Sequence, residues 1–268
     1  MPKNLKLLAF DTSTDRLSIA VTDGVRQWQH SGPGGAQAST TLIPAILALL
    51  AESGLALDEL DAIVFGRGPG SFTGLRTACA VAQGLAFGAR HGAGLPVLPV
   101  DTLMALAEEA RFQRAGAAAA LGATSEAPLT VTALLDARMD EMYLQSYVFD
   151  SGKCTSLMDC ELIRPENLVP DAATQLLAGN VFGVYAARLP AALATFPRVD
   201  ALPSASALLR LAPALVAAGR CVAAELALPL YVRDKVALTT EERAQAKHDK
   251  AEAALAGLAS GLVQPGPP

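Results

Sequence analysis

Short apolar runs alternate with longer segments of helical periodicity along the first part of the chain. Apolar or alternating runs of about five to eight residues are typical of strands, whereas apolar residues recurring every three or four positions are typical of helices. The pattern predicts elements in the order β-β-β-α-β-α-β-α. Strands are expected at residues 5–10, 16–24, 26–31, 60–66 and 95–100, and helices at 39–54, 72–89 and 101–113.

Residues typical of helix ends occur at these boundaries. Ser39 is a candidate N-cap of the first helix, and Gly54 is a candidate for the left-handed residue that follows it. Ser71 is expected to cap the second helix, and Asp101 or Thr102 the third.

A second series of strands and helices follows from residue 129. It repeats the opening of the first series, because three strands again precede the first helix, and this favours a duplicated α/β unit. Strands are expected at 129–138, 141–150, 154–163 and 175–180, and helices at 182–193 and 204–219. A charged helix is expected at 239–260, followed by a disordered end at 263–268.

Composition narrows the class of protein. The chain has 268 residues, of which 51% are apolar and 18% charged, and its net charge is −5. This net charge argues against a protein that binds nucleic acid without a partner, since phosphate binding needs clustered lysine and arginine. The four cysteines are not arranged as CxxC pairs, so no zinc or redox motif is indicated. Asp11 interrupts the first apolar run, and the other runs end before the ~20 residues of a membrane span. We therefore expect a cytoplasmic protein without a membrane segment.

A glycine-rich loop, GRGPGSFTGLR at 66–76, joins an expected strand to an expected helix. It matches neither the phosphate-binding GxxxxGK[ST] pattern nor GxGxxG. Its glycines permit a tight turn with close backbone approach, and the free amides of the helix could receive an anion. Gly68, Gly70, Ser71 and Thr73 are therefore candidates for a weak, vestigial anion or nucleotide site. The alternative is that Ser71 caps the helix and nothing binds.

Five segments together resemble the TsaB (YeaZ) family, which acts in making threonylcarbamoyladenosine in tRNA. They are LLAFDTSTDRLSIAV at 7–21, GRGPGSFTGLR at 66–76, QGLAFG at 83–88, LLDARMDEMY at 134–143 and PLYVRDKVA at 229–237. The resemblance implies an actin-like (ASKHA, ribonuclease H-like) fold with two βββαβαβα halves. It also implies paralogy with TsaD, the subunit that carries the transfer site.

Proteins similar to TsaD hold a metal on a His-x-x-x-His helix and on a later aspartate, and this chain departs from that pattern. Thr102 and Leu106 occupy the positions of the two histidines. Asp200 and Glu225 enclose a stretch without any acidic residue, where the late ligand would fall. We therefore expect no metal, no cofactor and no catalytic residue. Ala38 occupies the place where relatives often carry a histidine.

The resemblance implies a phosphate-facing or metal-facing role for Asp11, with Thr12 and Ser13 beside it. Without a lysine or a second acid nearby, the residues themselves favour a hydrogen-bonded turn, DTSTD, over that role. They join the glycine-loop residues as a possible vestigial site.

The predicted function is that of a non-catalytic scaffold. The resemblance implies a heterodimer with TsaD, engagement of the ATPase TsaE, a homodimer without TsaD, and tRNA contact only through the complex. Helices 39–52 and 72–89 are expected to form the interface, through Leu42, Ile46, Leu75, Ala78 and Ala82. The alternative is a nucleotide phosphohydrolase or glycoprotease-like enzyme that uses the 66–73 loop. Domain boundaries are expected at 1–106, 107–237 and 238–268.

Overall fold

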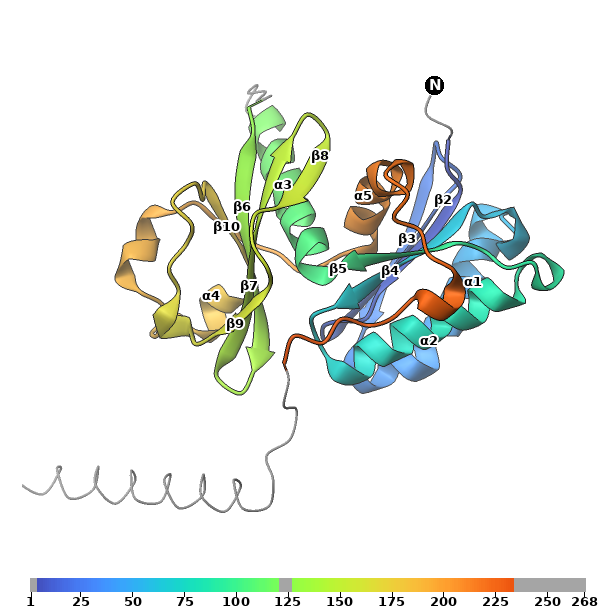
Figure 1. The fold of residues 1–268 in the computed structure, drawn as a ribbon, viewed down its shortest axis with the longest axis horizontal. Coiled ribbons are helices and arrows are strands. Elements are labelled where there is room, and N and C mark those ends of the chain that lie inside the picture. Colours follow the sequence, from blue (N-terminus) through green and yellow to red (C-terminus); the bar gives the residue numbers. More distant parts are fainter. Residues whose placement is uncertain (1–3, 121–126, 234–268) are drawn as a thin grey trace, which may run out of the picture. The chain divides into compact units, whose positions relative to one another are not determined.

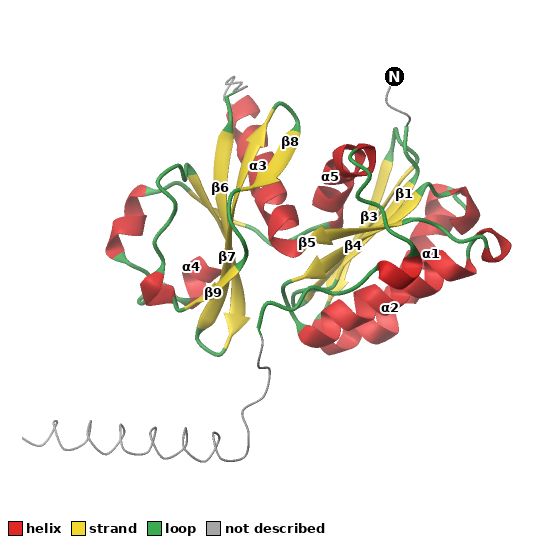
Figure 2. Ribbon diagram, viewed as in Figure 1, coloured by secondary structure: helices red, strands yellow, loops and turns green. Residues whose placement is uncertain are grey.

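The computed structural model describes residues 4–120 and 127–233. The tail helix expected at 239–260 and the disordered end expected at 263–268 lie outside these residues. The residues up to Val232 form one compact unit, with two β-sheets and helices packed against them (Figures 1 and 2).

The first sheet has five strands in the order β3-β2-β1-β4-β5. β1 pairs antiparallel with β2 and parallel with β4, and its five residues are all buried because helices cover both faces of the sheet. The elements are β1 (Leu7–Asp11), β2 (Arg16–Thr22), β3 (Gln27–Pro33), α1 (Ala38–Ser53), β4 (Ala62–Gly68), α2 (Phe72–Gly88), β5 (Val97–Asp101) and α3 (Thr102–Ala120). This order is the predicted β-β-β-α-β-α-β-α.

The second sheet repeats the pairing of the first. Its order is β11-β10-β6-β7-β8, with β6 antiparallel to β7 and parallel to β10. The elements are β6 (Leu129–Arg138), β7 (Glu141–Asp150), β8 (Lys153–Ser156), β9 (Glu161–Ile163), β10 (Leu176–Gly179), α4 (Val181–Val184), β11 (Arg198–Asp200) and α5 (Ala205–Ala217). The duplicated actin-like α/β fold is thus confirmed.

The second half departs from the predicted βββαβαβα series. Residues 154–163 form two short strands, β8 and β9, and no α-helix lies between β8 and β10 in the described chain. The helix expected at 182–193 is only the four-residue α4, because Pro190 cannot continue a helix and the chain turns at Tyr185. Strand β11 was not predicted, since three residues carry too little pattern.

The helices α3 and α5 do not follow the predicted domain boundary. Leu103 and Leu106 of α3 pack in one core with Val131 of β6, whereas Leu208 of α5 packs with Ala9 of β1. A boundary between residues 106 and 107 would cut α3, and α5 covers the sheet of the first half. The two halves therefore exchange helices, and sequence order alone does not separate them.

The helix ends follow local chemistry, with one exception. Gly54 ends α1 in the left-handed conformation at φ 72°, and the hydroxyl of Ser71 accepts the Gly74 amide at the start of α2, as predicted. The N-cap predicted at Ser39 is wrong, because α1 begins at Ala38 and the Ser39 hydroxyl donates to the Ala36 carbonyl.

Candidate functional site

The turn after β1 holds the first three candidate residues. Asp11, Thr12 and Ser13 are all buried, and Asp11 Oδ1 accepts hydrogen bonds from the Ser13 amide at 2.9 Å and its hydroxyl at 2.6 Å. Asp11 Oδ2 is buried without a hydrogen-bond partner in the described structure. Burial raises the pKa of the Asp11 carboxyl, and the two bonds from Ser13 oppose that rise only in part.

The glycine loop packs directly onto this turn. The Ser71 amide donates to the Ser13 carbonyl at 2.7 Å, and the Thr12 hydroxyl donates to the Gly74 carbonyl at 2.7 Å. A side chain at Gly74 would collide with the carbonyl of Thr12, and one at Gly70 would lie 2.5 Å from that of Ser13. The glycines are therefore needed for contact between two backbone segments.

The remaining loop positions are covered or open to solvent. Gly68, at φ 121°, leaves space that the carbonyl of Leu230 fills, because a Cβ there would lie 2.5 Å from that oxygen. Ser71 and Thr73 are exposed. The structure thus brings the predicted residues together, but their polar groups are largely engaged with one another. Within the described residues, no group of three or more His, Cys, Asp or Glu side chains is arranged to hold a metal ion.

The predicted interface residues lie inside the protein. Leu42, Ile46, Leu75, Ala78 and Ala82 are each at most 1% exposed. All except Leu75 belong to the core between the helices and the first sheet. They cannot contact a partner while the fold is intact, so this set is corrected. The reason is that α1 is apolar on more than one side, and periodicity did not identify which side the sheet covers.

The outer sides of α1 and α2 carry a different set of residues. Ile43 and Leu47 of α1 are 45% and 55% exposed, and Phe87 of α2 is 55% exposed. Exposed small residues accompany them on α2, at Ala80 and Gly84. Each helix has a single charged residue, Glu52 in α1 and Arg76 in α2. We call this surface, residues 43, 47, 80, 84 and 87 with their exposed neighbours on α1 and α2, the helix face.

The helix face also explains a membrane-like signal. The segment Gly35–Ser53 is long and apolar enough to cross a bilayer by length and composition, and only 28% of its most apolar window is buried. A helix that covers a sheet on one side and carries apolar residues on the other has the same composition. One such helix is weak evidence for a span.

A C-terminal strap, residues 221–232, lies along α2 (Figure 1). Val222 pairs with Val97 at the edge strand β5, and the Ala227 carbonyl accepts bonds from Cys79 Sγ at 2.8 Å and Gln83 Nε2 at 3.1 Å. The Leu230 amide donates to the Arg67 carbonyl at 2.7 Å. Sequence reasoning missed the strap, because the only signal was the segment PLYVRDKVA, which shows no periodicity.

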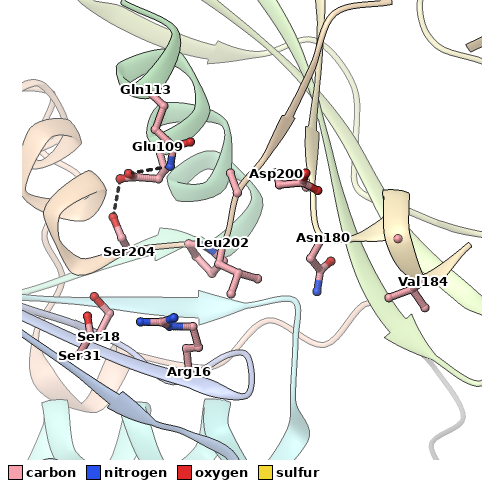
Figure 3. Close-up of a pocket in the computed structure, with 14 residues that line it drawn as sticks. Arg16, Ser18, Ser31, Glu109, Gln113, Asn180, Val184, Asp200, Leu202 and Ser204 are labelled. Carbon is pink, nitrogen blue, oxygen red and sulfur yellow. Dashed lines mark hydrogen bonds between the residues drawn. The ribbon is translucent and has the colours of Figure 1, made fainter. Parts of the chain in front are cut away.

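A separate open cleft of about 860 Å³ lies between α3, the first sheet, the end of β10 with α4, and the segment that joins β11 to α5 (Figure 3). Arg16 and Ser18 line it from the first sheet, and Asn180 and Asp200 from the second half. The Ser204 hydroxyl donates to Glu109 there, so part of its polar lining is already paired. None of the candidate residues predicted from the sequence lines this cleft.

Comparison with known proteins identifies close relatives. Residues 34–260 match a protein-family model described as "TsaD: tRNA N6-adenosine threonylcarbamoyltransferase". The chain is 35% identical to the tRNA threonylcarbamoyladenosine biosynthesis protein TsaB of Haemophilus influenzae, over 87% of this chain and 96% of that protein. Identity to the Escherichia coli TsaB is 32%, with the same coverage. The solved structure of YeaZ from Pseudomonas aeruginosa superposes with a TM-score of 0.70 at 39% identity, covering 85% of this chain and all of that one.

Proposed function

The chain belongs to the TsaB (YeaZ) family of tRNA threonylcarbamoyladenosine biosynthesis proteins, and from this premise we propose that it is a non-catalytic subunit that docks onto a TsaD-type transferase. Its part in tRNA threonylcarbamoyladenosine biosynthesis follows from that membership. The proposal adds that it acts in the cytoplasm, that TsaE joins the same complex, and that tRNA is contacted only through the complex.

The helix face carries this proposal. Ile43, Leu47 and Phe87 are each about half exposed or more on two helices that together hold only two charged residues. Apolar surface of this kind marks a site of association, because a monomer exposing it pays the cost of hydrating it. Ala80 and Gly84 are small and exposed, which allows a second helix to approach closely.

The proposed occupant is a transferase of the same fold. The chain matches a family model described as a TsaD transferase over residues 34–260, which supports a partner built on the same sheet-and-helix unit. The equivalent helices of such a partner would offer a surface of matching shape and length. Docking them against α1 and α2 would cover the helix face on both subunits.

The glycine loop favours a subunit without its own chemistry. The loop is packed against the β1–β2 turn by the Ser71 and Thr12 hydrogen bonds, and the strap covers Gly68. The loop itself, residues 66–73, contains no lysine, and Arg67 is paired with Asp101 at 2.5 Å. A phosphate would have to displace the chain's own backbone to reach this loop.

Binding to the purified TsaD-type subunit tests the proposal. Ile43→Asp combined with Leu47→Asp is expected to weaken binding at least tenfold while leaving the melting temperature within a few degrees, because both side chains are exposed. Val25→Asp is the matched control, since Val25 is 81% exposed and lies in the turn between β2 and β3. Unchanged affinity of the double variant would refute the docking face.

Reconstituted modification of tRNA tests the function itself. The transferase, TsaE and the adenylate-forming enzyme are combined with and without this chain, and threonylcarbamoyladenosine is measured by mass spectrometry. The modification is expected to depend on the chain and to be lost with the double variant. Hydrolysis of ATP by the isolated chain, measured by phosphate release with magnesium present, would instead support an enzyme.

A further inference from the structure

Arg76 is held in place on the surface of α2 by two aromatic residues. Its guanidinium carbon lies 3.9 Å from the ring centroid of Phe72, and its Nε donates to the Tyr231 hydroxyl at 3.2 Å. The rings of Phe72 and Tyr231 lie 5.3 Å apart and tilt by 37°. Tyr231 belongs to the strap, so the strap and α2 together fix the position of this charge.

Arg76 has no acidic partner among residues 4–120 and 127–233. Most other arginines stacked on rings do have one: Arg26 pairs with Asp23 at 3.2 Å, and Arg210 pairs with Glu108 at 2.8 Å. Arg198, which lies over the ring of Phe182, is the exception among the described residues. Stacking and the bond to Tyr231 leave the terminal amino groups of Arg76 able to donate to a further acceptor. Within the described chain, Arg76 is thus held in one orientation without a carboxylate to balance its charge.

Arg76 is also the only positive charge on α1 and α2. If a partner covers the helix face, this guanidinium loses part of its water, which is costly unless an acceptor replaces that water. A carboxylate is the best acceptor, because it can take two parallel hydrogen bonds from one guanidinium. Since the stacking already restricts the side chain, little further rotamer freedom is lost on binding.

We propose that Arg76, clamped by Phe72 and Tyr231, binds a carboxylate on an apolar helix of the transferase partner and sets the specificity of docking. The inference rests on the proposed function and names the chemistry by which the helix face selects its partner. Charge complementarity supports it, because an apolar face with one fixed cation is best matched by an apolar partner face that carries one carboxylate.

A second copy of this chain is the competing occupant. The helix faces of two copies could complete Arg76 only with Glu52, the single acid of α1 and α2. We assign the carboxylate to the transferase because the proposed function makes the transferase the occupant of the helix face, and the family-model match supports a partner of the same fold. The rescue experiment below distinguishes it from a second copy.

Charge reversal tests the assignment. Arg76→Glu is expected to weaken binding of the purified transferase subunit about thirtyfold or more, and Arg76→Lys to weaken it less, because lysine keeps the charge but loses the bidentate geometry. Arg26→Glu is the matched control, since Arg26 is also exposed and stacked on a ring but lies in the β2–β3 turn. Melting temperatures of all variants are compared, and that of Arg76→Glu is expected to stay near the wild-type value.

Rescue identifies the partner's acid. Single Asp→Arg or Glu→Arg changes on the transferase helices are screened against Arg76→Glu, and one is expected to restore affinity. If Arg76→Glu binds within twofold of wild type while Ile43→Asp with Leu47→Asp fails, the inference is overturned and the docking face stands. If neither variant affects binding, the docking face and the role of Arg76 are both refuted. If Glu52→Arg restores self-association of Arg76→Glu and no transferase change restores heterodimer binding, the occupant is a second copy and the assignment is wrong.

Discussion

The two sides of α1 are expected to respond oppositely to the same substitution. Leu42 and Leu47 lie about 1.4 helical turns apart, but Leu42 is fully buried against the first sheet and Leu47 is 55% exposed. Leu→Ala removes the same atoms at each position. Leu42→Ala leaves a cavity inside the core, whereas Leu47→Ala removes apolar atoms from the exposed helix face.

The sizes of the two effects follow from burial. Leu42→Ala is expected to lower the free energy of unfolding by about 3 kcal/mol, the sum of lost transfer energy and a residual cavity. For a unit of this size, that corresponds to a fall in melting temperature of roughly 6–12 °C. Leu47→Ala is expected to change stability by less than about 0.5 kcal/mol. It should weaken transferase binding about tenfold, because the partner would no longer cover those methyl groups.

Two measurements on each variant decide the matter. Urea denaturation followed by circular dichroism gives the free energy of unfolding, and calorimetric titration with the transferase subunit gives the dissociation constant. Leu42→Ala protein that remains folded at the assay temperature should bind with nearly wild-type affinity. A loss of binding without a loss of stability for Leu42→Ala, together with the reverse for Leu47→Ala, would show that the assignment of inner and outer sides is wrong.

Three further predictions test the loop, the helix ends and the buried acid. Gly74→Ala should destabilise the fold by about 1–3 kcal/mol, because the new Cβ meets backbone that cannot move freely. Gly84→Ala has open space around it and should stabilise the fold by about 0.5–1 kcal/mol. Thermal melts compare the two variants, and equal shifts in melting temperature would contradict the packing. Ser71→Ala should lower the free energy of unfolding by about 1 kcal/mol, because the N-cap of α2 is lost. Ser39→Ala should lower it less. Urea unfolding curves that rank the two variants in the other order would refute the cap assignment. Burial raises the folded-state pKa of Asp11 above its unfolded value, so its protonation stabilises the fold below about pH 4 and that contribution is lost as pH rises through the folded pKa. The free energy of unfolding of the wild type, relative to that of Asp11→Asn, should therefore fall as pH rises from about 4 through the folded-state pKa. A difference in urea unfolding that does not depend on pH would disprove the raised pKa.

Local patterns were sufficient for the elements of the first half. The run LLAFD is apolar almost throughout, which is typical of a strand covered on both faces, and β1 is such a strand. Ser71 and Gly54 define helix ends through backbone geometry that involves only neighbouring residues. The duplication could be predicted for the same reason, because each strand carries its own pattern.

The second half was harder to predict because its elements are short. A three-residue strand such as β11 is held by pairing with β10 and has almost no pattern of its own. The exchange of α3 and α5 between the sheets is also invisible to periodicity, which shows that a helix has an apolar side but not which sheet covers it.

The sequence by itself determined the α/β class, the duplicated unit, the family and the glycine loop, because each of these can be recognised from short segments whose own residues are close together in the chain. Only the tertiary structure decided which residues are available for binding. Leu42 and Leu47 are identical in chemistry and differ only in whether the sheet covers them. Likewise, Arg76 and Tyr231 are 155 positions apart, and only the path of the strap brings them together.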